Sequence, residues 1–266
     1  MIVPAQQPNV QQQVPNGRGD RTGSERVVHI EHLKKSFGER TVLNDVNLDL
    51  YQNENLVILG RSGTGKSVLI KCMVGLIPFD SGVINVLGYD VGHLDLKTLN
   101  ELRLQVGFSF QGSALYDSMT VRENLEFPLR RNLGMTDQKK LRDIVGEALE
   151  NVGLARAADQ FPAELSGGMK KRIGIARTLI LKPKIMLYDE PTAGLDPITS
   201  REINELINEV RDKYNTSSII ITHDISCARE TGDRIVALVN GYNKQEGSFE
   251  ELKATDDPEI KAFFTY

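Results

Sequence analysis

Apolar and polar residues alternate with a period of two in two segments near the start of the chain, residues 27–33 and 42–50. Alternation of this kind predicts strands that bury one face. The polar, glycine-containing stretch 35–40 between them is typical of a turn. These residues therefore predict a pair of antiparallel strands that opens the fold.

Further short segments are apolar on both faces, which is typical of strands in a mainly parallel sheet covered by helices. They are residues 56–59, 106–110, 185–189, 218–222 and 235–239. The first of them runs through a glycine-rich turn into a helical pattern over residues 66–76. We therefore expect an α/β fold with a mainly parallel core sheet and an added antiparallel β layer.

Strand patterns are missing between residues 111 and 165, where helical periodicity dominates. Residues 137–152 predict a helix, with Gly153 as the candidate for its C-terminal cap. We expect an α-helical subdomain at about residues 112–168.

This subdomain would interrupt an α/β domain that spans residues 26–256. Residues 1–25 are rich in Gln, Pro, Asn and Gly and predict a disordered tail. Residues 257–266 form a C-terminal tail with three aromatic residues. It is expected either to pack on its own domain or to bridge to a second copy of the chain.

Composition narrows the class of protein. The chain has 266 residues, 40% hydrophobic content and a net charge of −4, which disfavours a broad electrostatic surface for nucleic acid. It contains no run of the roughly 18 apolar residues that span a bilayer, and its first residues lack the pattern of a secretory signal. We expect a cytosolic protein in which Cys72 and Cys227, which lack metal-ligand spacing, are buried reduced thiols.

The strongest chemical signal is the segment 60–67, which matches the P-loop pattern G-x-x-x-x-G-K-[ST] between a predicted strand and a predicted helix. We call these residues the P-loop. Glycine N–H groups and a helix start suit a polyphosphate, Lys66 adds a cation, and the Ser67 hydroxyl is placed for Mg²⁺. The alternative is a glycine-rich turn that only caps a helix. The predicted nucleotide contacts are Gly60, Arg61, Ser62, Gly63, Thr64, Gly65, Lys66, Ser67 and Val68.

A second signal is the apolar strand 185–189, which ends in Asp189 and Glu190. Adjacent acids can divide the work of hydrolysis: Asp189 would hold Mg²⁺, and Glu190 would act as general base on the attacking water. The alternative is a strand that simply ends in solvated charge.

A third signal is Ser166, Gly167 and Gly168 at the start of a predicted helix. Its free N–H groups form a second anion-binding terminus without the lysine of a P-loop, so it is half a site. A helix N-cap without further function is the alternative for Ser166.

The order of these signals, a P-loop, then L-S-G-G, then an apolar strand ending in D-E, resembles the ABC ATPases over about residues 27–250. The resemblance implies a P-loop ATPase that binds ATP and Mg²⁺. It also implies a head-to-tail homodimer, in which Ser166, Gly167 and Gly168 of one copy close over the γ-phosphate on the P-loop of the other.

The resemblance implies roles for four further residues. Gln111 corresponds to the glutamine that senses Mg²⁺ and the attacking water. Asp196 corresponds to an acid that crosses the dimer. His223 corresponds to the histidine that bonds the γ-phosphate, although a structural role is its alternative. Phe37 is placed to stack on adenine, or else packs on its own hairpin; stacking reads no base edge, so ATP and GTP would be poorly distinguished.

Residues 110–130, Met169 and residues 194–200 are similar to the ATP-binding subunits of Mla/Mce-type lipid transporters. This implies an integral membrane permease, an Mce-domain lipid-binding partner, a phospholipid or related cargo and a position on the cytoplasmic side of the bacterial inner membrane. Residues 112–121 would line a groove for a permease helix, or would only pack the helical subdomain.

Two rival hypotheses belong to other functional classes. One is a soluble ABC ATPase acting on ribosomes or DNA, which usually has two cassettes or a long coiled coil; this chain has neither. The other is a regulatory module that binds nucleotide without hydrolysing it, which would be expected to lack Glu190 or His223.

Overall fold

The computed structural model describes residues 24–265, so all but the last two residues of the predicted N-terminal tail lie outside the described residues. Strands β1 (Arg26–Phe37) and β2 (Arg40–Tyr51) are antiparallel, as predicted, and Phe37 pairs with Arg40. The turn is shorter than predicted, because the strand pairing continues to Phe37 and leaves only Gly38 and Glu39 between the strands. Strands β4 (Ser81–Val86) and β5 (Tyr89–Asp90), which the sequence pattern did not predict, extend this layer beside β1.

The predicted parallel sheet is present in the order β9-β3-β8-β7-β6. Its strands are β3 (Asn55–Leu59), β6 (Val106–Ser109), β7 (Ile185–Asp189), β8 (Ser217–Thr222) and β9 (Arg234–Val239). Strand β10 (Tyr242–Gly247) lies antiparallel to β9 and pairs with β2, so it joins the two layers into one ten-stranded sheet.

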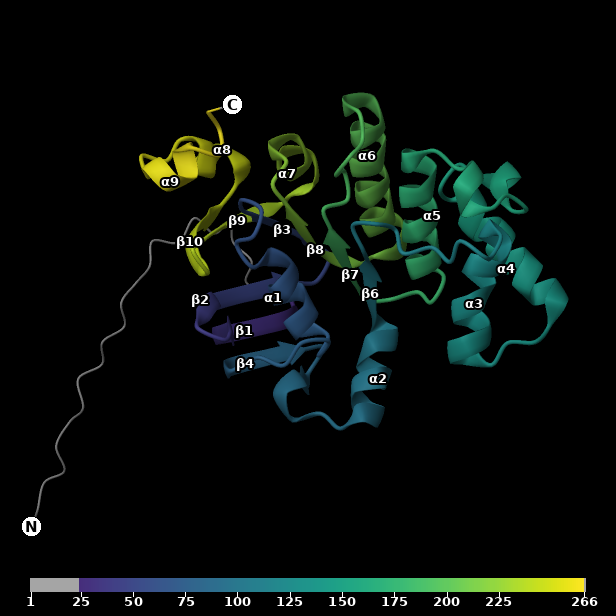
Figure 1. The fold of residues 1–266 in the computed structure, drawn as a ribbon, viewed down its shortest axis with the longest axis horizontal. Coiled ribbons are helices and arrows are strands. Elements are labelled where there is room, and N and C mark those ends of the chain that lie inside the picture. The colour runs from purple at the N-terminus through teal and green to yellow at the C-terminus, as the bar shows by residue number, and fades with distance from the viewer. Residues whose placement is uncertain (1–23, 266) are drawn as a thin grey trace, which may run out of the picture.

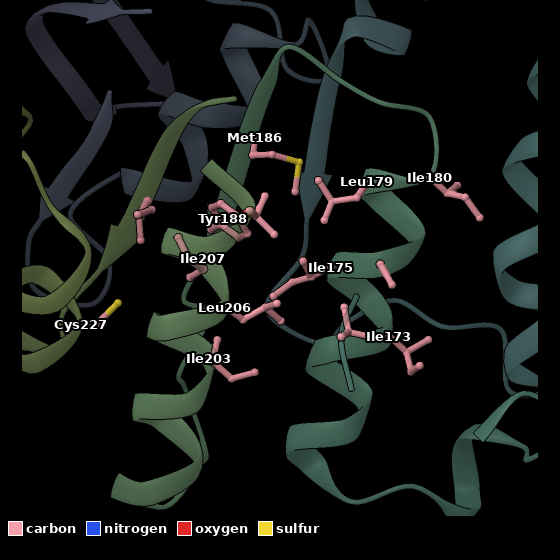
Figure 2. Close-up of a cluster of buried hydrophobic side chains, with 14 of the residues drawn as sticks. Ile173, Ile175, Leu179, Ile180, Met186, Tyr188, Ile203, Leu206, Ile207 and Cys227 are labelled. Atoms are coloured by element: carbon pink, nitrogen blue, oxygen red, sulfur yellow. The ribbon is translucent and has the colours of Figure 1, made fainter. Parts of the chain in front are cut away.

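Alternate residues of the core strands enter two separate hydrophobic clusters. In β3, Leu56 and Ile58 enter one cluster together with residues of α1 (Lys66–Met73) and α2 (Leu96–Gln105). Val57 and Leu59 enter the other, which includes residues of α5 (Gly167–Leu179), α6 (Pro197–Tyr214) and α7 (Ile225–Thr231). Figure 2 shows this second cluster between β7 and the facing sides of α5 and α6. Burial on both faces explains why these strands are apolar throughout.

The helical segment contains α3 (Val121–Leu133) and α4 (Gln138–Glu150), which lie beyond α5 at the opposite end of the molecule from α8 and α9 (Figure 1). Gly153 has φ 70° and donates from its N–H to the carbonyl of Glu150, while Leu154 donates to Leu149. These two bonds form the glycine cap predicted for this helix. Short 3₁₀ turns cover Val91–His93, Ala155–Ala157 and Pro162–Glu164.

The C-terminal segment packs on its own chain. It forms α8 (Phe249–Lys253) and α9 (Pro258–Lys261), and the ring of Phe264 meets that of Phe249 at a centroid distance of 5.5 Å. Phe263 and Phe264 both contact the second hydrophobic cluster. Up to Thr265, the tail therefore packs on its own domain, and bridging to a second copy stays a prediction.

Within residues 24–265, no helix has both the length and the apolar character needed to cross a membrane. Cys72 and Cys227 are buried free thiols, as predicted.

Candidate nucleotide-binding and hydrolysis site

Three of the predicted motifs follow directly on neighbouring parallel strands. Gly60 follows β3, Glu190 follows β7 and His223 follows β8. The N–H of Gly60 donates to the carbonyl of Thr222 at 3.2 Å, and that of Glu190 donates to Ile221 at 2.9 Å. Because parallel strands end at the same edge of the sheet, the P-loop, the acidic pair and the histidine meet there.

The geometry of the P-loop requires its glycines. Gly63 and Gly65 have φ values of 80° and 98°, which disfavour residues with a side chain. A Cβ on Gly60 would lie 2.8 Å from the carbonyl oxygen of Leu238, and one on Gly65 would lie 2.8 Å from a methyl group of Val42. No side chain caps α1, which leaves its first N–H groups for an anion. The loop therefore fits a phosphate chain.

The cation of the P-loop lies inside the loop. Lys66 is 5% exposed, and its Nζ donates to the carbonyls of Gly60 at 2.7 Å and Arg61 at 3.1 Å. Nζ also lies 3.3 Å from a carboxylate oxygen of Glu190. Lys66 thus connects the phosphate loop to the acidic pair.

The oxygen atoms expected to hold Mg²⁺ are adjacent. The hydroxyl of Ser67 donates to the carboxylate of Asp189 at 3.1 Å. Burial raises the pKa of Asp189, and the hydrogen bond from Ser67 opposes that shift. Mg²⁺ prefers one or two such protein oxygens together with water and phosphate oxygens, so this donor set fits the ion.

Glu190 is held by its main chain and its side chain. Its φ is 48°, a left-handed conformation that is unfavourable for a residue with a Cβ. Nδ1 of His223 lies 2.8 Å from Oε2 of Glu190, and the main-chain N–H of His223 donates to the same oxygen at 3.3 Å. A carboxylate fixed between a lysine and a histidine can orient and deprotonate a water molecule.

The Ser166 loop, predicted as half of a second anion site, is a helix cap in this structure. The hydroxyl of Ser166 accepts from the N–H of Met169 at 3.2 Å, so Ser166 caps α5. Asp196 caps α6 by accepting from Ile198 and Thr199 at 3.0 Å each. In the part of the chain that the structure describes, no hydrogen bond joins the Ser166 loop to the P-loop.

Phe37 lies at the end of β1 with 49% of its surface exposed, and Nζ of Lys35 is 5.1 Å from its ring centroid. It is not enclosed by its own hairpin.

Residues 112–121, predicted to line a groove for a permease helix, include both packed and exposed side chains. Leu115 packs against the core, whereas Tyr116 is 45% exposed and its ring lies 5.0 Å from that of Phe127.

Lys171 is not among the residues that the sequence motifs predict for the site. It is 8% exposed on the buried face of α5, three residues after Gly168 and three before Gly174. Its Nζ donates to the main-chain carbonyl of Gln111 at 2.6 Å and to that of Glu190 at 3.1 Å. The available signal was a charged residue at a core position of an otherwise apolar helical stripe.

Comparison with known proteins gives a consistent class. A family model described as ABC transporter matches residues 43–193. The chain is 39% identical over 236 residues to a probable ribonucleotide transport ATP-binding protein, mkl, of Mycobacterium leprae, covering 89% of this chain and 68% of that protein. It is also 39% identical over 237 residues to the methionine import ATP-binding protein MetN of Rhizobium johnstonii, covering 89% and 65%. The chain thus spans about two thirds of the length of these relatives.

Solved structures agree in fold. The ATP-binding cassette MJ0796, a dimer in a post-hydrolysis state bound to ADP and phosphate, superposes with a TM-score of 0.76 at 32% identity, covering 84% of this chain and 98% of that one. CbiO1 from Clostridium perfringens, part of the ABC transporter complex cbiONQ, gives 0.79 at 28% identity, covering 88% and 92%.

The chain belongs to the ABC transporter family and contains its ATPase domain, which binds ATP with Mg²⁺. The two relatives are named for different solutes, a ribonucleotide and methionine, so their names do not define a common cargo.

Proposed function

We propose that this chain is the ATP-hydrolysing subunit of a membrane ABC transporter that moves phospholipid or a related lipid. Residues 26–256 would form the ATPase domain, with a helical subdomain at about residues 112–168. The observation that carries the hydrolytic role is the position of Glu190 between Lys66 and His223, beside the oxygen pair of Ser67 and Asp189.

The residues of the site divide the steps of ATP binding and hydrolysis among them. The P-loop N–H groups and Lys66 bind the phosphates, and Ser67 and Asp189 hold Mg²⁺, which supplies charge neutralisation on the phosphate oxygens. Glu190 takes the proton of the attacking water, and His223 keeps the carboxylate in place. Gln111 contacts the same water, and Phe37 stacks on the base.

The second half of each site comes from another copy of the chain. Ser166 and the first N–H groups of α5 would approach the γ-phosphate held by the partner's P-loop, with Asp196 beside them. The dimeric state of MJ0796, a similar cassette, supports this arrangement. Nucleotide can bias a transporter only through its different affinity for closed and open dimers.

The lipid cargo depends on residues 110–130, Met169 and residues 194–200, which are similar to Mla/Mce-type ATPases. In this proposal the chain lies on the cytoplasmic side of the bacterial inner membrane. A permease helix contacts the exposed surface at Tyr116 and Phe127, and an Mce-domain protein carries the lipid.

Substitution of Glu190 tests the hydrolytic role. Glu190→Gln should lower the rate of phosphate release by a factor of roughly 10² or more, because the amide cannot accept the proton, while ATP binding is retained. Glu205→Gln, an exposed carboxylate paired with Arg201, is the matched control and should retain wild-type turnover. Wild-type turnover in Glu190→Gln would refute the assignment of the base.

The transport role is tested by the proteins that copurify with the chain. From detergent-solubilised membranes of the native host, an integral permease and an Mce-domain protein should be recovered with it. Recovery of ribosomes or DNA without a permease would instead support a soluble ABC ATPase. A permease accompanied by a solute-binding protein without an Mce domain would retain the transporter and refute the lipid cargo.

A further inference from the structure

The side chain of Lys171 joins two segments that approach the nucleotide from different elements. It is almost fully buried, and its Nζ donates to the main-chain carbonyl of Gln111, after β6, and to that of Glu190, after β7. Burial lowers the pKa of Lys171, and the charges of Asp189 and Glu190 oppose that shift. Burying the charge of a lysine costs free energy of solvation. The two bonds to main-chain carbonyls offset part of this cost.

The Glu190 contact falls on a strained part of the main chain. Glu190 has φ 48°, and the carbonyl that receives Lys171 also accepts from the N–H of Ala193 at 3.2 Å. A left-handed residue with a Cβ persists only when its surroundings hold it there. Lys171 is one of the groups that hold it.

The Gln111 contact falls on a loop that α5 holds at several points. Arg177, further along the same helix, donates to the carbonyls of Ser113 and Ala114 at 3.1 and 2.8 Å. Ser113 and Ala114 also have positive φ values, of 60° and 48°. Arg177 thus contacts only the loop after β6, whereas Lys171 contacts both this loop and Glu190.

We propose that Lys171 is a positioning residue for ATP hydrolysis. It fixes the main chain of Glu190 relative to that of Gln111, so that the carboxylate and the side-chain amide meet one attacking water. Because Ser166 caps the same helix five residues earlier, about 7.5 Å along its axis, Lys171 also links the base to the half-site that faces the partner copy. This inference depends on the proposed role of Glu190 as the base.

The test compares variants of the full chain by steady-state ATPase kinetics. Lys171→Met removes both donated bonds and should lower kcat by roughly 10- to 100-fold, as expected for a displaced catalytic group. KM for ATP should change by less than about twofold, because Lys171 does not touch the P-loop. Lys171→Arg, which can still donate to two carbonyls, should recover most of the lost kcat.

Lys170→Met is the matched control. Lys170 precedes Lys171 on α5, is half-exposed, and should tolerate the substitution with wild-type kinetics. The amount of ATP bound per chain gives the folded fraction of every variant, so that a loss of folded protein is not read as a loss of turnover.

A double-mutant cycle separates positioning from general damage. If Lys171 acts through Glu190, Lys171→Met should slow the wild type but leave the residual single-turnover rate of Glu190→Gln within about twofold. Equal slowing in both backgrounds, an unchanged kcat, or a rise in KM that accounts for the loss would overturn the proposal. Normal turnover in Glu190→Gln alone would instead refute the proposed base.

Discussion

At the scale of single residues, side-chain contacts accompany a left-handed main-chain conformation in the candidate site. Glu190 adopts a left-handed conformation, and His223 and Lys66 contact its carboxylate. Gly63 and Gly65 reach similar conformations without a side chain. The proposed function explains the difference, because in it the loop needs only N–H groups whereas position 190 supplies a carboxylate.

The two cysteines give a prediction at this scale. Burial raises the pKa of Cys72 to about 11 and that of Cys227 to about 12. Because the thiolate is the reactive form, both thiols should resist a disulfide reagent at pH 8 in the native protein and react fully in guanidinium. Absorbance of the released thiol measures this; rapid reaction of the native protein would contradict the burial of these residues.

At the scale of elements, α5 combines several tasks along one helix. Its start carries Ser166, the proposed half-site. Its buried face supplies Lys171, and its close approach to α6 depends on Gly168. A Cβ on Gly168 would lie 2.4 Å from a methyl group of Thr199. The glycine at this position therefore allows α5 and α6 to pack closely.

Gly168→Ala should destabilise the protein by about 1–3 kcal/mol, because the added methyl group overlaps α6. Gly146→Ala is the matched control in α4, where a Cβ would meet no atom within 4 Å, and it should stabilise by about 0.5–1 kcal/mol. Urea unfolding measures both changes. Equal stability of the Gly168 variant and the wild type would show that α5 and α6 can separate without cost.

At the scale of the whole molecule, the described chain contains one complete phosphate loop and, at the start of α5, the helix cap that we propose as a half-site for a second copy. The P-loop, acidic pair and histidine meet at the edge of the sheet, whereas Ser166 bonds within its own helix. Two such molecules placed head to tail would complete two sites, which is the reason for proposing a dimer.

Glu190→Gln with ATP and Mg²⁺ should double the mass measured by light scattering, because hydrolysis no longer opens the dimer. Adding Ser166→Arg should keep the protein monomeric, since the larger side chain blocks the γ-phosphate, while ATP affinity of the monomer changes by less than about threefold. Ser81→Arg, on an exposed residue of β4, is the control and should still dimerise. A stable dimer of the Ser166 variant would refute the head-to-tail arrangement.

The sequence alone determined the features that depend on local pattern and short motifs. Period-two alternation predicted β1 and β2, doubly apolar runs predicted the five parallel strands, and the motif at residues 60–67 predicted a loop whose glycines adopt the required conformations. These features are local because strand faces and glycine conformations are set by neighbouring residues. Strands β4, β5 and β10 and helix α2 were not predicted. Strand β5 has only two residues, β10 is mainly polar, and α2 buries only Leu102, so these elements have weak apolar periodicity.

Only the tertiary structure decided which distant residues meet. The contact of Glu190 with Lys66 and His223 arises because β3, β7 and β8 are parallel neighbours. The bridge from Lys171 to Gln111 and Glu190 spans separations of 60 and 19 residues. No local pattern encodes such pairs, because their distance is set by strand order and helix packing across the whole fold.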